Sequence, residues 1–297
     1  MTQIGECKLC LSKKDLQDSH FLPASIYKIC RDAATGQNPI ALSVGVAKHT
    51  TDQISAYVFC SECEKLLNGK GEAWTHLNMA RPEGFLIRDA LEKVAPALAT
   101  DHFAVYAGAG VRGIDIDQLS YFGMSIFWRA AVLRWPALNE GEPRMNRLWF
   151  DKYEEPIRLF LLTGAPVPPA ISLLISVWPH KNPLPPIAFH TPVGKRNQGW
   201  YSYSFYIPGL DFKLAIGREI PPVLRQMSAF ALPERYIYSS VAAATEMMQS
   251  FGKVVHKSVA IGKLATEYQQ EMKLCEGSRC QVTKKNFPFS AKTCLTR

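Results

Sequence analysis

Four cysteines near the start of the chain fall into two matched pairs. Each pair has the spacing Cys-x-x-Cys. Cys7 and Cys10 form the first pair, and Cys60 and Cys63 form the second. A tight turn lets both sulfurs of such a pair point at one ion, and a second pair from a distant segment completes the tetrahedral thiolate set of a structural zinc. The alternative is four unrelated buried cysteines, which two such pairs in one short segment argue against. The spacing therefore predicts a structural zinc that closes a long loop.

The remaining cysteines have no such spacing. Cys30 lies alone between the pairs, and we interpret it as a buried small apolar residue. Cys275, Cys280 and Cys294 lie in the tail, where a second metal site would need a fourth ligand such as His256. We favour incidental thiols in an irregular tail, and the metal site stays open as the alternative.

Residues 5–80 resemble the zinc-containing branch of the HNH nucleases, also called ββα-metal or His-Me finger nucleases. The resemblance is carried by an order of motifs. These are Cys7-x-x-Cys10, His20 shortly before Pro23, a long loop, an apolar segment Ile54–Phe59, Cys60-x-x-Cys63 and Glu64. The family would fold this segment as two strands and a helix, held together by the zinc.

The resemblance also implies a reaction. In the family a histidine removes a proton from water, and the hydroxide attacks a phosphodiester phosphorus while one divalent ion stabilises the developing charge. His20 matches that general base. Asp18 and Glu64 match the hard oxygen ligands that a catalytic Mg²⁺ or Mn²⁺ prefers. His76, further along the same segment, is a weaker candidate for a ligand or a phosphate contact.

Three positions depart from the family pattern. Ser19 stands directly before the histidine where the family has Asp or His, so Asp18 needs a bulge in the strand to reach the ion. Ser55 stands near the position of the Asn that orients the histidine, and Glu64 replaces an Asn or His. The alternative interpretation is therefore a zinc module that has lost catalysis and binds nucleic acid or a partner protein.

A looser likeness extends over more of the chain. The segments Leu16–Pro23, Phe59–Glu64 and Tyr121–Arg129 resemble parts of a group of bacterial HNH-like proteins linked to phage defence. The likeness implies the same biological setting here, and it carries little mechanism.

Composition limits the class of protein. The chain has 297 residues, 47% of them hydrophobic, and a net charge of +8, which suits a polyanionic partner. We expect nucleic acid, DNA rather than RNA. No apolar stretch reaches the roughly 20 residues of a membrane span, and the first residues lack a signal-peptide core. These features predict a cytoplasmic protein, where thiols stay reduced and paired cysteines favour metal.

The order of elements predicts an α+β fold in two parts. A zinc-anchored ββα module of the HNH type is expected over residues 1–80, with a loop or hairpin near 32–46. A larger domain of mixed helices and antiparallel strands is expected over 81–297, as a specificity or partner surface or a homo-oligomer interface. Its expected parts are helices over about 85–163, a β-rich section over 170–217, helices over 240–274 and a basic tail over 275–297.

Apolar periodicity gives finer expectations. Helices are predicted over Glu64–Met79, Phe85–Leu98, Gln118–Trp135 and Tyr153–Leu162. Strands are predicted over Ile54–Phe59, His102–Ala107, Ile171–Trp178, Pro186–His190, Trp200–Ile207 and Phe212–Ile216.

Two further groups of residues have both a structural and a functional interpretation. Trp128 and Trp135 share a helix face, so we expect them in the core with Arg129 and Arg134 extending outward, although the four could grip nucleic acid. Lys195 and Arg196 belong to a basic, glycine-flanked segment that is either a plain hairpin turn or a weak contact to a nucleic acid backbone.

Overall fold

The computed structural model forms two compact units. It describes residues 3–31, 38–43, 46–81, 83–136, 146–179, 189–240, 257–267 and 269. Unit 1 comprises residues 1–29 and 53–245, and unit 2 comprises residues 30–52 and 246–297. The basic tail with its three cysteines lies outside the described residues, and so do His256 and most of the predicted helical segment 240–274.

A small antiparallel sheet opens unit 1. Its strands, in the order β1-β2-β5, are β1 (Gln3–Glu6), β2 (Lys13–His20) and β5 (Ser55–Cys60). The strand predicted over Ile54–Phe59 is thereby confirmed. A helix begins directly after β5, so two antiparallel strands lead into a helix through the second cysteine pair.

That helix runs in three connected pieces: α2 (Ser61–Leu67), the π-helical turn η1 (Asn68–Glu72) and α3 (Ala73–Asn78). The helix predicted over Glu64–Met79 is therefore present, and it passes through its glycines by widening to a π turn. A Cβ on Gly71 would lie 2.8 Å from the backbone nitrogen of Phe122. The glycine thus permits close contact between this turn and the helix that contains Phe122.

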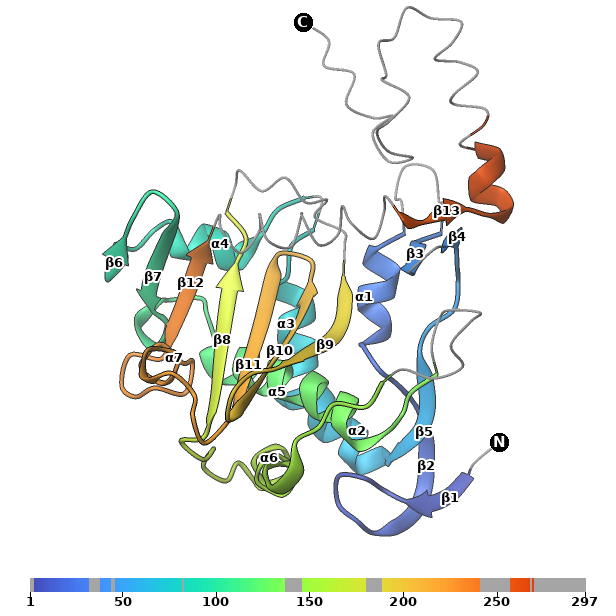
Figure 1. Ribbon diagram of the computed structural model, residues 1–297, viewed down its shortest axis with the longest axis horizontal. Coiled ribbons are helices and arrows are strands. Elements are labelled where there is room, and N and C mark those ends of the chain that lie inside the picture. The colour runs from blue at the N-terminus through green and yellow to red at the C-terminus, as the bar shows by residue number, and fades with distance from the viewer. Residues whose placement is uncertain are drawn as a thin grey trace, which may run out of the picture. The chain divides into compact units, whose positions relative to one another are not determined.

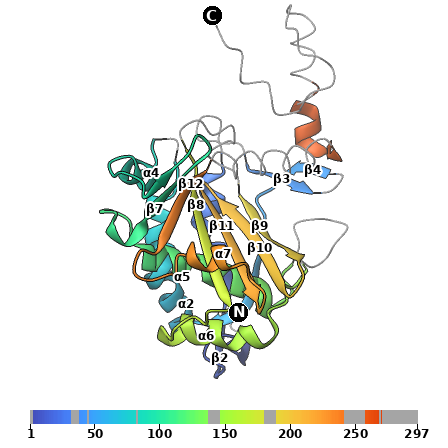
Figure 2. The same ribbon diagram turned by 60° about the vertical axis from the view of Figure 1, so that its left-hand side comes forward.

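Seven strands form the main sheet of unit 1, in the order β6-β7-β12-β8-β11-β10-β9 (Figures 1 and 2). They are β6 (Leu98–Ala99), β7 (Phe103–Ala107), β8 (Ile171–Val177), β9 (His190–Arg196), β10 (Trp200–Ile207), β11 (Leu210–Gly217) and β12 (Tyr236–Ser240). Neighbouring strands are antiparallel except β12 and β8, which pair parallel. The predicted β-rich section is present, but the strand expected over Pro186–His190 is found at His190–Arg196, with residues 186–188 outside the described part of the chain. Strand β12 was not predicted.

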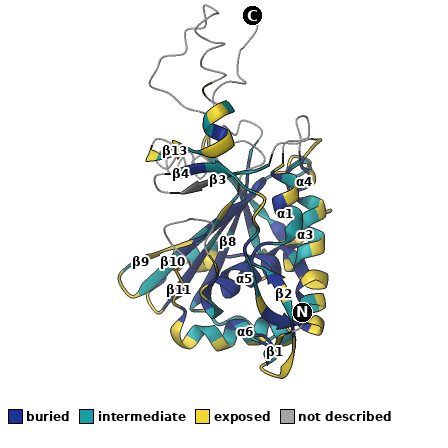
Figure 3. Cartoon of the chain, turned by 90° about the vertical axis from the view of Figure 1, so that its right-hand side faces the viewer, coloured by how far each residue is buried: buried dark blue, intermediate teal, exposed yellow. Residues whose placement is uncertain are grey.

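Helix α5 (Ile116–Val132) lies across one face of this sheet (Figure 1). Asp115 caps its start by accepting a hydrogen bond of 3.0 Å from the backbone nitrogen of Gln118. Fourteen of its 17 residues are buried, and Figure 3 shows it dark blue at the centre. A helix that is buried on all sides packs against more than one layer.

Aromatic contacts join α5 to both sheets of unit 1. Phe127 packs against Phe205 of β10 with ring centroids 4.8 Å apart. On the other side, Trp128 stacks on Phe59 of β5 at 5.8 Å. One hydrophobic core therefore extends from the small sheet through α5 to the large sheet.

Shorter helices complete unit 1: α1 (Ala24–Ile29), α4 (Leu86–Leu91), α6 (Glu154–Thr163) and α7 (Pro222–Gln226), with 3-10 turns η2 (Gly108–Gly110) and η3 (Asp151–Tyr153). Helix α6 matches the prediction over Tyr153–Leu162. Helix α4 ends seven residues earlier than the predicted Leu98, because Pro96 disfavours helical backbone before it and Leu98 belongs to β6. None of the described helices is long and apolar enough to cross a membrane.

Unit 2 holds a three-stranded sheet in the order β13-β4-β3. Its strands are β3 (Ile40–Ser43), β4 (Val46–His49) and β13 (Val259–Ala260). The hairpin of β3 and β4 agrees with the expected excursion between the cysteine pairs. His49 Nε2 lies 2.8 Å from a carboxylate oxygen of Glu267, which ties the hairpin to the helical turns after β13.

The described chain is therefore a mixed α+β protein with antiparallel sheets, as the sequence predicted. The boundary expected between residues 80 and 81 lies inside unit 1. That residues 1–80 form a module of their own stays a prediction.

Candidate metal centre and neighbouring pocket

The four paired cysteines meet at one point of unit 1. Cys7 and Cys10 lie in the turn between β1 and β2, while Cys60 ends β5 and Cys63 lies in the first turn of α2. Their Sγ atoms all lie within 4.8 Å of one another, and those of Cys10 and Cys60 are 3.9 Å apart. Sulfurs bound tetrahedrally to one zinc at ~2.3 Å lie about 3.8 Å apart. The cluster therefore has the donor set and spacing of a structural zinc site.

The cysteines are free thiols and not disulfides. Within the described residues, they are the one group of three or more Cys, His, Asp or Glu side chains whose ligand atoms converge in this way. The predicted set Cys7, Cys10, Cys60 and Cys63 thus comes together as the sequence indicated.

Backbone geometry shapes the first cysteine turn. Leu11, directly after Cys10, has φ of 60°, and its nitrogen donates to the Cys7 carbonyl at 2.8 Å. The backbone nitrogen of Cys60 donates to Cys7 Sγ at 3.3 Å, which links the two cysteine turns. Arg158 of α6 donates to the Leu9 carbonyl at 2.6 Å and so fixes the turn from outside.

The pKa values of the sulfurs shift in different directions. Burial is the largest influence on Cys10 and raises its pKa, but hydrogen bonds from the backbone and hydroxyl of Ser12 and from Cys7 and Cys63 together lower that pKa to about 7. Burial raises the pKa of Cys60 to about 11 and also raises that of Cys63. Cys30 is a buried thiol whose pKa burial raises to about 12, as expected for a small apolar residue.

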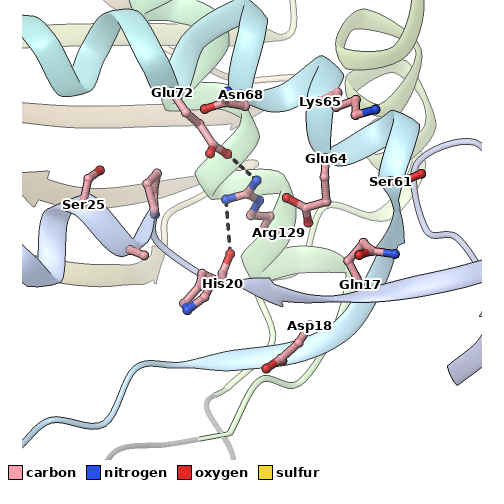
Figure 4. Close-up of a pocket in the computed structure, with 12 residues that line it drawn as sticks. Gln17, Asp18, His20, Ser25, Ser61, Glu64, Lys65, Asn68, Glu72 and Arg129 are labelled. Carbon is pink, nitrogen blue, oxygen red and sulfur yellow. Dashed lines mark hydrogen bonds and ion pairs between the residues drawn. The ribbon is translucent and has the colours of Figure 1, made fainter. Parts of the chain in front are cut away.

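A pocket of about 500 Å³ lies beside the cysteine cluster, and Figure 4 shows the side chains that line it. It is bounded by the end of β2, the start of α1 and one face of the helix that begins after Cys60. Its polar lining residues are Gln17, Asp18, His20, Ser25, Ser61, Glu64, Lys65, Asn68, Glu72 and Arg129. The pocket thus unites His20, Asp18 and Glu64, the three residues that the resemblance singled out.

Strand alternation explains why Asp18 and not Ser19 accompanies His20. Residues two apart along a strand share a face, so Asp18 and His20 lie on the pocket side of β2. Ser19 is buried on the other side, where its Oγ accepts a hydrogen bond of 3.3 Å from the Phe59 nitrogen. The pairing of β2 with β5 also shifts between Gln17 and Asp18, and the extra residue at this bulge is Val58 of β5. The bulge expected in the strand of Asp18 is therefore not in β2, and Asp18 reaches the pocket side through strand alternation.

The helix supplies the opposite wall. Glu64, Asn68 and Glu72 follow one another at four-residue steps, so they share one helix face. In Figure 4, Glu64 and Glu72 extend from the helix toward Arg129. Oε1 of Glu64 is buried and has no hydrogen-bond partner among the described residues. The sequence analysis did not identify Asn68 and Glu72. Their four-residue spacing from Glu64 could have indicated that all three share one face of the helix.

Arg129 lies at the base of the pocket and is the main correction to the sequence analysis. We expected it to extend outward, but its side chain is only 1% exposed because α5 is covered on every side. It forms an ion pair with Glu72 and donates to the carbonyls of His20 and Phe21 at 3.3 and 3.2 Å. The expected burial of Trp128 and Trp135 and exposure of Arg134 are confirmed.

The register of the small sheet also places Ser55. It pairs directly with His20 across β2 and β5, so both side chains project from the same face of the sheet. A serine hydroxyl at that position can accept a hydrogen bond from an imidazole N–H.

The weaker candidates lie outside this pocket. His76 of α3 contacts Arg81, whose Nη2 donates to the His76 carbonyl at 2.9 Å. Burial lowers the pKa of His76, and the nearby Arg81 and Lys28 lower it further. Its contact with Arg81 gives it a structural role at the end of α3.

Lys195 and Arg196 occupy exposed positions at the end of β9, the edge strand of the large sheet. β9 and β10 form a hairpin as expected, but its turn is limited to Asn197–Gly199, because Lys195 and Arg196 pair with β10 as strand residues. A contact to nucleic acid stays a prediction.

Comparison of the chain with protein-family models, with curated protein sequences and with solved structures found no match.

Proposed function

We propose that unit 1 hydrolyses phosphodiester bonds of nucleic acid, DNA rather than RNA, at an HNH-like site that a structural zinc anchors. The observation that supports this most is the lining of one pocket by His20 and Glu64. The first stands at the end of β2, and the second stands in the first turn of a helix whose start is fixed by the cysteine cluster. The two strands and the helix thus present a base and a carboxylate to the same space.

In this proposal His20 is the general base. It takes a proton from a water molecule, and the resulting hydroxide attacks the phosphorus of a phosphodiester in the pocket. Ser55 orients the imidazole from the neighbouring strand. Arg129 acts as a positioning residue, since its bonds to the carbonyls of His20 and Phe21 fix the backbone that carries the imidazole.

Asp18 and Glu64 would hold a divalent ion such as Mg²⁺ or Mn²⁺. Mg²⁺ characteristically keeps several waters and takes only one or two carboxylates together with substrate phosphate. Two carboxylates are enough for such an ion, so the proposal does not need a set of converging side chains like that of the four cysteines. The buried Oε1 of Glu64, which lacks a hydrogen-bond partner among the described residues, fits an additional ligand in the pocket. When bound, such an ion stabilises negative charge on the phosphate and on the leaving oxygen.

The test is cleavage of plasmid DNA, and separately of RNA, by purified protein with Mg²⁺ or Mn²⁺. We expect wild type to cleave DNA and His20→Ala to lose cleavage while keeping its zinc. His102→Ala is the matched control, because His102 is an exposed histidine in the turn before β7. Equal cleavage by wild type and His20→Ala, or none by either, refutes the proposal.

A second candidate follows from the contrast between the two sites. The cysteines converge on one point, whereas Asp18, His20 and Glu64 share a pocket without converging. The zinc module would then be non-catalytic and bind nucleic acid or a partner protein. It predicts one zinc per chain, no turnover with any divalent ion and, for nucleic acid, binding that weakens steeply with salt.

The phage-defence role that the resemblance implies stays a prediction. The test of this role is the number of phage plaques on cells that express wild type or His20→Ala. Equal numbers of plaques would contradict the role.

A further inference from the structure

A second recess of about 270 Å³ lies in unit 1, away from the His20 pocket. It forms where the segment before α6 passes the ends of β10 and β11. Its lining includes Trp149, Lys152, Tyr201 and Arg218. Its volume is below the ~300–1,000 Å³ of pockets for drug-sized ligands, so it suits one ring system. We call it the aromatic recess.

Trp149 is exposed although its backbone is fixed. The side chain is 63% exposed, whereas the next residue, Phe150, is 2% exposed. Tyr203 of β10 donates its hydroxyl to the Trp149 carbonyl, and the rings of Phe150 and Tyr203 pack edge to face at 5.4 Å. An exposed indole on such a rigid support offers a large flat surface at little cost in conformational entropy.

Tyr201 supplies a second aromatic surface. It is half-buried and stacks on Tyr203 with a centroid distance of 6.0 Å and an interplanar angle of 5°. Gly217 lets β11 approach the start of β10 closely, because a Cβ there would lie 2.5 Å from the Gly199 carbonyl oxygen. The recess is thus lined by the side chains of Trp149 and Tyr201 and by the backbone of Gly199 and Gly217.

Three exposed cations surround these rings. Lys152 and Arg218 line the recess, and Arg196 pairs across the sheet with Tyr201 and therefore lies on the same face. Asp151 also lines the recess, and the Glu219 side chain lies against Gly199 of the lining, so the net positive charge is modest. Rings flanked by cations bind single-stranded nucleic acid, where bases stack on aromatic side chains and Lys or Arg neutralise the phosphates.

We propose that the aromatic recess binds one unpaired nucleotide of a single-stranded nucleic acid. Its base stacks on Trp149 or Tyr201, and Lys152, Arg196 and Arg218 contact the adjoining phosphates. This inference rests on the proposed nucleic acid substrate, and it adds a contact outside the His20 pocket.

The experiment measures binding of a labelled 12-nucleotide single strand, as oligo-dT and as oligo-rU, by fluorescence anisotropy without Mg²⁺ or Mn²⁺. Trp149→Ala should weaken binding about tenfold, the size expected for loss of one stacked base. Trp149→Phe should restore part of the affinity, because it keeps a ring. Leu77→Ala is the matched control, since Leu77 of α3 is also 63% exposed. It should bind like wild type.

Two further variants sharpen the test. Lys152→Ala and Arg218→Ala should each reduce the slope of log affinity against log salt by about 0.7, the value for one phosphate contact on a single strand. A duplex of matched sequence should bind Trp149→Ala and wild type equally, because its bases are already stacked. Equal affinity of Trp149→Ala and wild type for the single strand overturns the inference.

The two proposals fail separately. Cleavage that depends on His20, together with unchanged single-strand binding by Trp149→Ala, refutes the recess alone. Weakened binding by Trp149→Ala, together with no cleavage by wild type, supports the recess and refutes the nuclease.

Discussion

Replacing Arg129 by Met tests the link between α5 and the pocket. The side chain is 1% exposed, it pairs with Glu72, and it donates to the carbonyls of His20 and Phe21. Its guanidinium also lies 5.5 Å from the ring centroid of Phe59. Met keeps much of the apolar volume and removes all of the charge.

The expected loss follows from these contacts. Removing one partner of a buried ion pair costs about 3–5 kcal/mol, because the other charge stays buried and unpaired. Replacing Glu72 by Met as well removes the stranded carboxylate. What then remains is the loss of two hydrogen bonds to carbonyls, at about 1 kcal/mol each. We therefore expect Arg129→Met to lower the free energy of unfolding by about 4 kcal/mol and the double Met variant to lower it by about 2 kcal/mol.

The assay is urea unfolding of zinc-loaded protein, followed by tryptophan fluorescence. Arg112→Met is the control, since Arg112 is exposed in the segment before α5 and should change stability by less than about 0.5 kcal/mol. Arg129→Lys should not restore stability, because one ammonium lacks the planar fork that serves two carbonyls and a carboxylate. A loss below about 1 kcal/mol for Arg129→Met, or a double variant less stable than the single, would refute the buried network.

The remaining predictions concern the metal, the π turn and pH. Cys63→Ser should lower the zinc content measured by atomic absorption from one ion per chain and should unfold the small sheet, and full zinc retention would contradict the site. Gly71→Ala should destabilise unit 1 by about 1–3 kcal/mol because the Cβ meets the backbone of Phe122. Gly69→Ala should stabilise unit 1 by up to about 1 kcal/mol, because a Cβ on Gly69 has no atom within 4 Å. If urea unfolding finds Gly71→Ala more stable than Gly69→Ala, the close contact between the π turn and α5 is wrong. The pKa of His76 is lowered by folding, so the unfolded chain binds the proton more tightly and stability should fall as pH drops from 7 to 5. His76→Gln should make the free energy of unfolding less dependent on pH between 7 and 5. An unchanged pH dependence would show that other groups cause it.

The metal centre was predictable because its signal is local. A Cys-x-x-Cys spacing fixes two sulfurs on one turn whatever surrounds it, and the remaining requirement is that the turns meet. The structure meets that requirement, with Cys10 Sγ 3.9 Å from Cys60 Sγ. The fold class and most strands of the large sheet were predictable for the same reason, since they depend on short apolar patterns.

The pocket was only partly predictable, since its residues come from separate elements. His20 and Glu64 were identified through the order of motifs around the cysteines. Asn68 and Glu72 repeat with Glu64 at helical spacing, but a polar helix face is usually solvated, so the repeat alone did not indicate a wall. Strand β12 was missed because it ends at residue 240, where the sequence analysis expected a helical section to begin.

Arg129 could not be assigned from sequence because its environment depends on both faces of α5. An arginine beside buried tryptophans normally extends to solvent. Here the large sheet covers one face through Phe127 and Phe205, and the small sheet covers the other through Trp128 and Phe59. The side chain therefore reaches only the base of the pocket and not the outer surface, and a buried carboxylate makes its charge tolerable.

This arrangement makes α5 part of the pocket's support. The cysteine cluster lies at the start of the helix that carries Glu64 and Glu72, and Arg129 binds Glu72 and the backbone of His20. The pocket thus has two supports, one from the cysteine cluster and one from a helix more than a hundred residues along the chain from His20. Removing the metal should disturb Glu64 first, because it follows directly after Cys63. Loss of the Arg129 guanidinium should instead disturb His20, which lies farther from the sulfurs along β2. Zinc content and pocket geometry are therefore separable properties, and a variant can keep the ion while it misplaces the imidazole.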